Sequence, residues 1–284
     1  MTTTRKTPVD IDLTVDDPSN QLLATLSGVR FRPSNYAVIA KAIDEELTRH
    51  ERPECSPRGL TIGYVNPHVI TSALSHPEIL LHLDECDYVC IDGTGVWLAL
   101  QLWRHGIERL PAYPACDYLL DSGVLRGSLA VIGIAPELIG PAADEIVRRN
   151  PNVDIVVQAH GFSTDDEIEA SLANSQPQTI LIGAGAPRSE QFALIARRVC
   201  PDAIVFHVGG GTFNNYAGVR PHAPRILSTL GVDWIHRFVT EPHTRARYLK
   251  GLPDFAFRVR QGPNSVEVEA IEAYANEENC EDVK

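Results

Sequence analysis

Asp92 is the first residue whose type and position suggest chemistry. It directly follows the apolar run 88–91 and precedes Gly93, Thr94 and Gly95. A carboxylate at the end of a buried strand can act as a general base that takes the proton of a hydroxyl group. An Asp in this place can equally cap the next helix, and the position alone does not decide between the two roles.

Two glycine-rich stretches that follow apolar runs are candidates for binding an anionic ligand. In Gly183–Glu190, small residues would let a ligand approach the backbone, and Pro187 suits the first turn of a helix with free N–H groups. In Val208–Asn215, three consecutive glycines suggest a loop wrapped closely around a ligand. A tight turn and a flexible loop without a role are the respective alternatives. The first stretch is not a dinucleotide fingerprint, because Arg188 stands where the third glycine belongs.

A basic segment lies within an acidic chain. The 284 residues carry a net charge of -12, with 25 Lys and Arg against 37 Asp and Glu, which argues against a general nucleic-acid binder. Residues 220–260 nevertheless hold eight cationic side chains and three acidic ones. This segment is either a solvated face or a clamp for a diphosphate or for anionic lipid headgroups.

Several other chemistries lack the residues that they need. The sequence has no GxxxxGK phosphate loop, no HExxH zinc motif and no GxSxG nucleophile elbow. The only DxD motif is Asp10-Ile11-Asp12, near the N-terminus, where a metal site for a sugar nucleotide is not expected. Six cysteines without a CxxC pair indicate reduced thiols in a cytoplasmic protein. Neither a signal peptide nor an apolar run of about 18 residues is recognised.

The elements that must position these residues alternate along the chain. Apolar runs predict strands at 60–65, 88–91, 129–134, 155–157, 179–182 and 204–208. Helices are predicted near 67–82, 94–104, 135–149, 165–174 and 188–199, and before the first strand, where Ile39, Ile43 and Leu47 repeat every four residues after a cap candidate, Ser34. This alternation predicts an α/β, Rossmann-like fold with a mostly parallel sheet, which binds ligands at the carboxyl ends of its strands.

Composition divides the chain into four parts. We predict a flexible arm at 1–25, a core at 26–232, a basic appendage at 233–260 and an acidic tail at 261–284. The tail has seven acidic residues and one lysine, and we expect it to form a solvated helix around 266–274 or no regular structure.

Several blocks of the sequence resemble the WecG/TagA/CpsF glycosyltransferases, which are glycosyltransferase family 26. The blocks ILIGAGAPRSEQF, VFHVGGGTFNNYAGVRPHAPRIL and GVDWIHRFVTEPHTRARYLKG are similar to the C-terminal half of that family, and YVNPHVI and IDGTGV to its N-terminal half. The similarity extends from about residue 30 to residue 255. It implies the GT-E fold, a Rossmann-like core with a helical C-terminal appendage.

The resemblance also implies an activity. The family transfers a sugar with inversion, often N-acetylmannosamine from a UDP-sugar, without a bound metal or a cofactor. The usual acceptor is the hydroxyl group of a polyprenyl-diphosphate-linked saccharide in the synthesis of cell-surface polysaccharide. Such an enzyme would work in the cytoplasm, with residues 237–260 in contact with the inner face of the membrane.

The resemblance assigns roles to individual residues as well. Asp92 would be the base, and Asn66 and Tyr64 of the first block would complete the catalytic group. The C-terminal arginines would approach the diphosphate. The residues expected to bind substrates are Gly93, Thr94, Gly133, Gly183, Gly185, Pro187, Arg188, Ser189, Glu190, Gly209, Gly210, Gly211, Thr212, Phe213, Asn214, Arg237, Arg245 and Arg247.

The sequence departs from the family pattern at five positions. Tyr64 replaces a Thr, Ser189 a Gln, Asn214 an Asp, His222 an Arg and Asp233 a Glu. These changes concern the sugar and the acceptor more than the fold. A transferase with a soluble small-molecule acceptor therefore remains an alternative, which the acidic tail favours. An inactive nucleotide-sugar-binding protein is another, whereas the missing glycine fingerprint disfavours a dehydrogenase.

Overall fold

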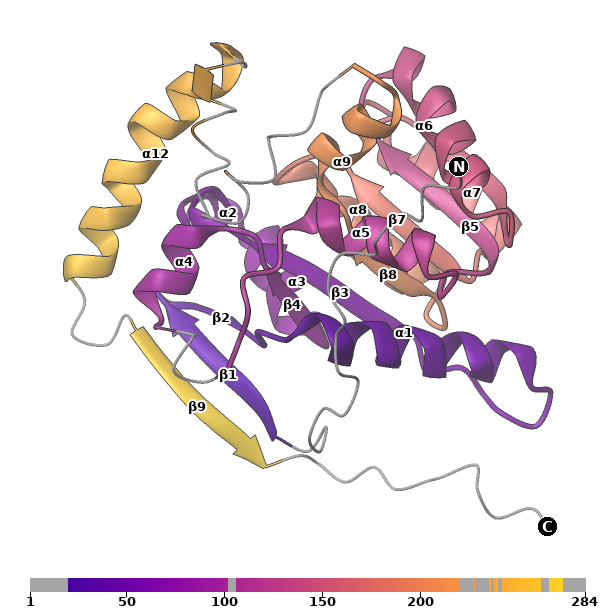
Figure 1. The fold of residues 1–284 in the computed structure, drawn as a ribbon, viewed down its shortest axis with the longest axis horizontal. Coiled ribbons are helices and arrows are strands. Elements are labelled where there is room, and N and C mark those ends of the chain that lie inside the picture. Colours follow the sequence, from indigo (N-terminus) through magenta and orange to yellow (C-terminus); the bar gives the residue numbers. More distant parts are fainter. Residues whose placement is uncertain are drawn as a thin grey trace, which may run out of the picture.

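The computed structural model describes residues 20–101, 106–219, 242–261 and 266–272, together with 227, 235, 238 and 239. Its centre is a six-stranded parallel sheet with the strand order β4-β3-β8-β7-β5-β6 (Figure 1). The strands are β3 (Leu60–Val65), β4 (Tyr88–Ile91), β5 (Gly127–Gly133), β6 (Val153–Ala159), β7 (Thr179–Gly183) and β8 (Ile204–His207). All six apolar runs form strands of this sheet, so the predicted Rossmann-like α/β fold is confirmed.

Helices cover both faces of the sheet. One face carries α1 (Tyr36–Glu51), α5 (Ala112–Asp121), α6 (Pro136–Arg149) and α9 (Gly209–Tyr216). The other carries α2 (Pro67–Ala73), α3 (Pro77–Glu85), α7 (Asp165–Ser175) and α8 (Arg188–Val199). In β5, Leu129 and Val131 pack toward the first group of helices, and Ala130 and Ile132 pack toward the second. Because both faces are covered, the strands are mostly apolar, which made them recognisable in the sequence, although the edge strand β6 carries exposed Asp154 and Gln158.

A second, three-stranded sheet contains both ends of the described chain. It has the order β2-β1-β9, and β1 (Asn20–Leu26) runs antiparallel to both β2 (Val29–Phe31) and β9 (Val266–Glu272) (Figure 1). The sequence predicted a flexible arm through residue 25, but Ala24 and Leu26 are fully buried. The expected tail helix is a strand instead. Its hydrogen-bond partner lies more than 200 residues away in the sequence, so the local charge pattern could not reveal it.

Local sequence explains the other differences from the predicted helices. The predicted helix at 67–82 is two helices, because Pro77 begins α3 and restrains the residue before it. Asn35, rather than Ser34, stands at the cap position of α1. Helix α5 was not predicted. The segment expected at 94–104 contains α4 (Thr94–Ala99), and residues 102–105 lie outside the described part of the chain.

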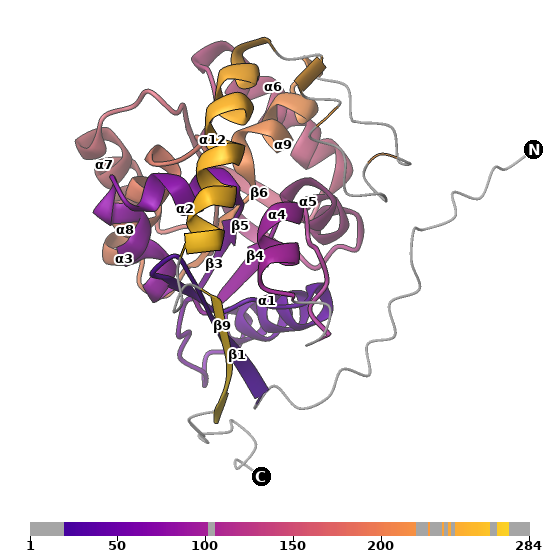
Figure 2. The same cartoon turned by 90° about the vertical axis from the view of Figure 1, so that its left-hand side faces the viewer.

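The appendage contains a long helix that packs against the core. Helix α12 (Pro242–Gln261) lies along α2, and Figure 2 shows it crossing the front of the molecule. Its Phe255 is buried in a hydrophobic cluster with residues of β1, β2, α2, α3 and α4. The predicted helical appendage is therefore confirmed, and one of its aromatic side chains belongs to the core.

Candidate functional site

The parallel strands bring the predicted site residues to one edge of the sheet. Asn66 follows β3, Asp92 follows β4, and the two glycine-rich stretches follow β7 and β8. These four strands are consecutive neighbours in the sheet, although the residues are up to about 140 positions apart in the sequence. The carboxyl edge is where open α/β sheets bind their ligands.

The turns after β3 and β4 are joined closely. The amides of Asp92 and Gly93 both donate hydrogen bonds to the Val65 carbonyl, at 3.1 and 3.3 Å. A Cβ atom on Gly93 would lie 2.4 Å from Cδ of Pro67 and 2.9 Å from Cα of Asn66, so only glycine fits there. The half-buried Asp92 is thereby held beside the Asn66 turn.

The residue that follows Asp92, and not Asp92 itself, stands at the cap position of the next helix. Helix α4 begins at Thr94, and the residue at its cap position is Gly93. Asn66 does cap a helix, because its Oδ1 accepts hydrogen bonds from the amides of His68 (2.9 Å) and Val69 (3.0 Å) at the start of α2. Side-chain capping is thus established for Asn66, whereas the general-base interpretation of Asp92 and its alternative, a structural role at the start of α4, both stay predictions.

Several predicted ligand groups of the turn after β7 already have partners within the protein. Ser189 Oγ accepts hydrogen bonds from the amides of Ala184 (3.0 Å) and Gly185 (2.8 Å). Arg188 pairs with Asp165 of α7 at 2.6 Å and lies over the ring of Phe192. Two amides expected to face an anion are therefore already engaged within the turn.

The three glycines after β8 form the first turn of α9 and not a loop. They fit because neighbouring turns pack closely on them. A Cβ on Gly210 would lie 2.9 Å from the Gly183 carbonyl oxygen, and one on Gly183 would lie 2.7 Å from the ring of Phe213. One on Gly133 would lie 2.5 Å from the Gly183 carbonyl carbon.

The start of α9 presents backbone donors at the same edge. The first amides of a helix have no acceptor within the helix, and they carry its positive dipole end. Thr212 bonds back to the Val208 carbonyl, and both Thr212 and Phe213 are buried. The backbone of Gly209–Gly211, rather than the side chains that follow it, is therefore suited to an anion.

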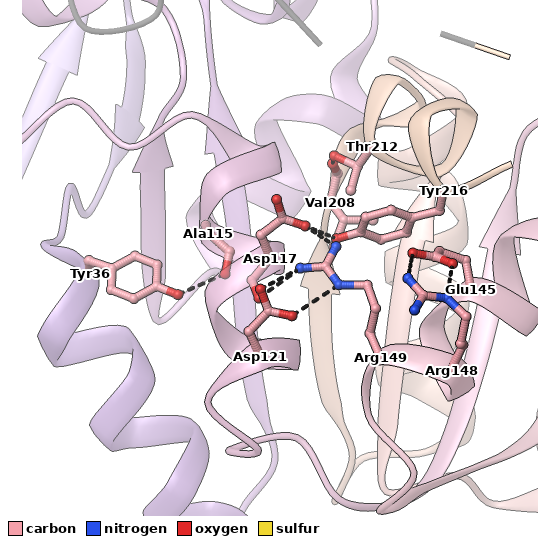
Figure 3. Close-up of polar contacts among 10 residues, drawn as sticks. All are labelled: Tyr36, Ala115, Asp117, Asp121, Glu145, Arg148, Arg149, Val208, Thr212 and Tyr216. Atoms are coloured by element: carbon pink, nitrogen blue, oxygen red, sulfur yellow. Dashed lines mark hydrogen bonds and ion pairs between the residues drawn. The ribbon is translucent and has the colours of Figure 1, made fainter. Parts of the chain in front are cut away.

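A polar network that sequence reasoning missed fixes the other end of α9 (Figure 3). The Tyr216 hydroxyl donates to Oδ1 of Asp117 at 3.0 Å, and Arg149 contacts the same carboxylate. Arg149 also pairs with Asp121 at 2.8 Å and lies over the ring of Tyr216, 5.2 Å from its centroid. Because the members come from α5, α6 and α9, no local spacing indicates them.

A second group of polar side chains is buried beneath the turns, and of its members only Glu190 was predicted, as a substrate-binding residue. His82 of α3 and His207 of β8 stack with ring centroids 4.4 Å apart. Burial lowers the pKa of His207 to about 4 and lowers that of His82 well below its usual value. Glu190 of α8 is 2% exposed, and burial raises its pKa to about 7. Both histidines are thus neutral at pH 7, as buried groups without an opposite charge should be.

We expect Glu190 to make stability depend on pH. Its carboxyl group is neutral in both states below pH 4.5, whereas above pH 7 folding buries its charge. Stability contributed by the protonated group is therefore lost as the pH rises from 4.5 through 7, by about 3 kcal/mol. Glutamine cannot ionise, so Glu190→Gln should not lose this free energy of unfolding. Urea titrations should therefore show the variant becoming more stable relative to wild type as the pH rises through the same range. Glu85→Gln, at an exposed position, is the control, and its free energy of unfolding should depend on pH as that of wild type does. The same pH dependence in Glu190→Gln and wild type would contradict the role of Glu190.

The described part of the basic appendage offers few free arginine donors. Arg245 is exposed, and its guanidinium donates to the carbonyls of Phe238 and Val239, both at 2.8 Å. Arg258 pairs with Asp254 at 2.9 Å. Arg237, His222 and Asp233 lie outside the described residues, as does the side chain of Arg247.

The described residues contain neither a group of side chains suited to a metal ion nor a helix that could span a membrane. Within these ranges, no three His, Cys, Asp or Glu side chains are grouped so that they could hold a metal ion. None of the helices in the same part of the chain is long and apolar enough to span a membrane. The Asp10-Ile11-Asp12 motif lies outside the described residues.

Comparison with known proteins agrees with this architecture. The model of the glycosyl transferase WecG/TagA/CpsF family matches residues 24–265. N-acetylglucosaminyldiphosphoundecaprenol N-acetyl-beta-D-mannosaminyltransferases from Staphylococcus aureus strains NCTC 8325 and COL are 23% identical over 258 residues, which cover 89% of this chain and 98% of each relative. The relative from strain MRSA252 has the same identity and coverage. The match over most of the chain shows that this protein belongs to the WecG/TagA/CpsF family of glycosyltransferases.

Proposed function

We propose that this enzyme transfers a sugar from a UDP-sugar to a hydroxyl group of a polyprenyl-diphosphate-linked saccharide, with inversion and without a bound metal. N-acetylmannosamine is the first candidate sugar, because the S. aureus relatives are named as N-acetylmannosaminyltransferases acting on N-acetylglucosaminyldiphosphoundecaprenol. The observation that carries the proposal is the placement of Asp92 and the first turn of α9 at one edge of the sheet.

The chemistry follows from these two groups. Asp92 takes the proton of the acceptor hydroxyl. The oxygen of that hydroxyl attacks the anomeric carbon of the donor sugar from the face opposite the diphosphate. The bond from that carbon to the diphosphate oxygen breaks, and UDP leaves with its added negative charge. Amides at the start of α9 are suited to stabilise this charge, because fixed dipoles aimed at a developing anion lower the barrier. Cations of the appendage, including Arg245, are further candidates for the diphosphate.

The appendage is also the candidate surface for peripheral contact with the membrane. Leu249 and Phe257 of α12 are 64% and 59% exposed, and Arg245 and Arg260 are exposed on the same helix. Apolar side chains next to cations are the combination that binds an anionic membrane surface. A lipid-linked acceptor would be presented at that surface.

A direct test compares donors and acceptors. Purified enzyme is incubated with UDP-N-acetylmannosamine, UDP-N-acetylglucosamine or UDP-glucose, and with an undecaprenyl-diphosphate-linked N-acetylglucosamine or a water-soluble analogue lacking the lipid. We expect transfer of N-acetylmannosamine to the lipid-linked acceptor. Faster transfer to the soluble analogue would overturn the proposed lipid-linked acceptor. Binding of UDP-sugars without any transfer would overturn the proposed transfer reaction.

We further expect UDP to bind equally well with and without EDTA. The sequence offers no DxD motif in its core, and helix dipoles with cations can neutralise a diphosphate. Isothermal titration calorimetry with EDTA, and then with added Mg²⁺ or Mn²⁺, measures the dissociation constant in each condition. A strict need for either metal ion would overturn the metal-independent part of the proposal.

A further inference from the structure

The buried polar group beneath the site has no part in the proton transfer proposed above, yet it connects the two glycine-rich turns. His207 is the last residue of β8, so its backbone leads directly into the first turn of α9. Ser189 lies in the first turn of α8, next to the β7 turn. Both side chains are 1% exposed. They therefore join elements from inside and do not form a surface for ligands.

Hydrogen bonds connect His207 to Ser189 and Ser189 to the β7 turn. The His207 Nε2 atom lies 3.1 Å from the Ser189 carbonyl, which can only accept, so Nε2 carries the proton. Ser189 Oγ in turn accepts from the amides of Ala184 and Gly185. The chain of contacts thus runs from the end of β8, through Ser189, to the β7 turn.

Aromatic packing fixes the His207 ring from the other sides. One face stacks on His82, with an angle of 20° between the rings, and Tyr64 approaches with its centroid 6.0 Å away. The same Tyr64 lies beneath Gly209, where a Cβ would be 3.5 Å from the tyrosine hydroxyl. Burial keeps the imidazole neutral, so the ring acts as a fixed donor and not as a charge.

We propose that His207 and Ser189 are positioning residues that hold the β7 turn against the first turn of α9 and thereby preorganise the diphosphate-binding edge for the UDP donor. This inference rests on the function proposed above. A binding site of backbone amides has no side chains of its own to adjust, so its affinity depends on how firmly its turns are held. The two turns lie so close together that a Cβ on Gly210 would stand 2.9 Å from the Gly183 carbonyl oxygen, so a small shift between them would matter.

Ser189→Ala tests the proposal with the smallest change. It removes one oxygen and leaves two amides of the β7 turn without their acceptor. We expect the dissociation constant of UDP to rise about tenfold, because the free energy of a tenfold change in affinity is close to the net contribution of one hydrogen bond. The affinity for the acceptor, measured as its KM at saturating donor, should stay near wild type.

Ser128→Ala is a matched control at the opposite edge of the sheet. Ser128 Oγ also accepts a backbone hydrogen bond, from the amide of Gln178 at 3.0 Å near the start of β7. Both variants should lose thermal stability, and Ser189→Ala should lose more because it leaves two amides without an acceptor rather than one, but only Ser189→Ala should lose UDP affinity. This comparison separates a positioning role from general loosening of the fold.

His207→Phe provides a second, independent variant. It keeps an aromatic ring between His82 and Tyr64 and removes the donor to Ser189, so it should also weaken UDP binding. If the two residues act through one another, the effect of the double variant should be clearly smaller than the product of the single effects, whereas Ser189→Ala and Ser128→Ala should combine independently.

The outcomes are distinguishable from failure of the proposed function. Wild-type affinity for UDP in both Ser189→Ala and His207→Phe would overturn the positioning role, as would equal losses in Ser189→Ala and Ser128→Ala. Should Ser189→Ala not fold, the same decision rests on UDP binding by His207→Phe. Absence of UDP binding by the wild-type enzyme would instead contradict the proposed donor.

Discussion

Asp92→Asn should lower kcat by about 100- to 10,000-fold while the protein remains folded. General-base catalysis contributes this range, which corresponds to about 3–5 kcal/mol of the activation barrier. Asn has nearly the same shape as Asp but does not take up a proton. Steady-state kinetics with saturating donor and acceptor measure the effect, and UDP affinity and thermal stability should stay near wild type.

The same variant distinguishes a catalytic role of Asp92 from a structural one. If Asp92 only supported the start of α4, Asn would serve about as well, because Asn and Asp are comparable helix caps. Unimpaired kcat would therefore remove Asp92 from the catalytic group. A loss confined to UDP affinity would move it to donor binding. Asn66→Asp can be measured alongside Asp92→Asn, because it keeps the side-chain oxygen that caps α2 and should therefore retain the fold.

Phe255→Ala should lower the free energy of unfolding by about 3–5 kcal/mol. Phe255 is 6% exposed and packs from α12 into the cluster that contains Leu26 of β1 and Ile70 of α2. Truncating a buried Phe to Ala loses its burial energy and leaves a cavity. The change should also reduce turnover, because the same ring lies against Gly95 of α4, where a Cβ would be 3.2 Å from it, close to Asp92. Urea denaturation and donor turnover measure the two effects.

Phe257→Ala is the matched control for this prediction. It lies on the same helix two residues further on, but it is 59% exposed. Exposed substitutions of this kind usually change stability by no more than about 0.5 kcal/mol. Equal, small effects of the two variants would show that α12 does not dock on the core as the structure describes. Loss of membrane binding by Phe257→Ala alone would support its proposed contact with lipid.

The burial of Phe255 also bears on where the core ends. The composition of the sequence placed the end of the core at residue 232 and a basic appendage at 233–260. Since α12 closes part of the hydrophobic cluster, a chain that ends before this helix would expose Leu26, Phe31 and Ile70. We therefore expect such a truncation to destabilise the protein as well as to inactivate it.

The sequence by itself determined the central sheet and the edge at which the candidate site lies. Strands such as Leu60–Val65 and Thr179–Gly183 are covered on both faces, so each is mostly apolar and visible in a short window. Because such strands are parallel, the residues after them must gather at one edge. Asp92 and the glycine-rich stretches could therefore be placed together before any coordinates were known.

Only the tertiary structure decided what each turn does there. Glycine disfavours helices, so Gly209–Gly211 indicated a loop. They form the first turn of α9 instead, and at Gly210 a Cβ would stand 2.9 Å from the Gly183 carbonyl oxygen of the β7 turn. Ser189 was grouped with ligand-binding residues, yet its hydroxyl binds Ala184 and Gly185. His207 was not predicted to have a role, and β9 was not predicted as a strand. Each of these outcomes depends on contacts between residues far apart in the chain, which no periodicity within one segment encodes.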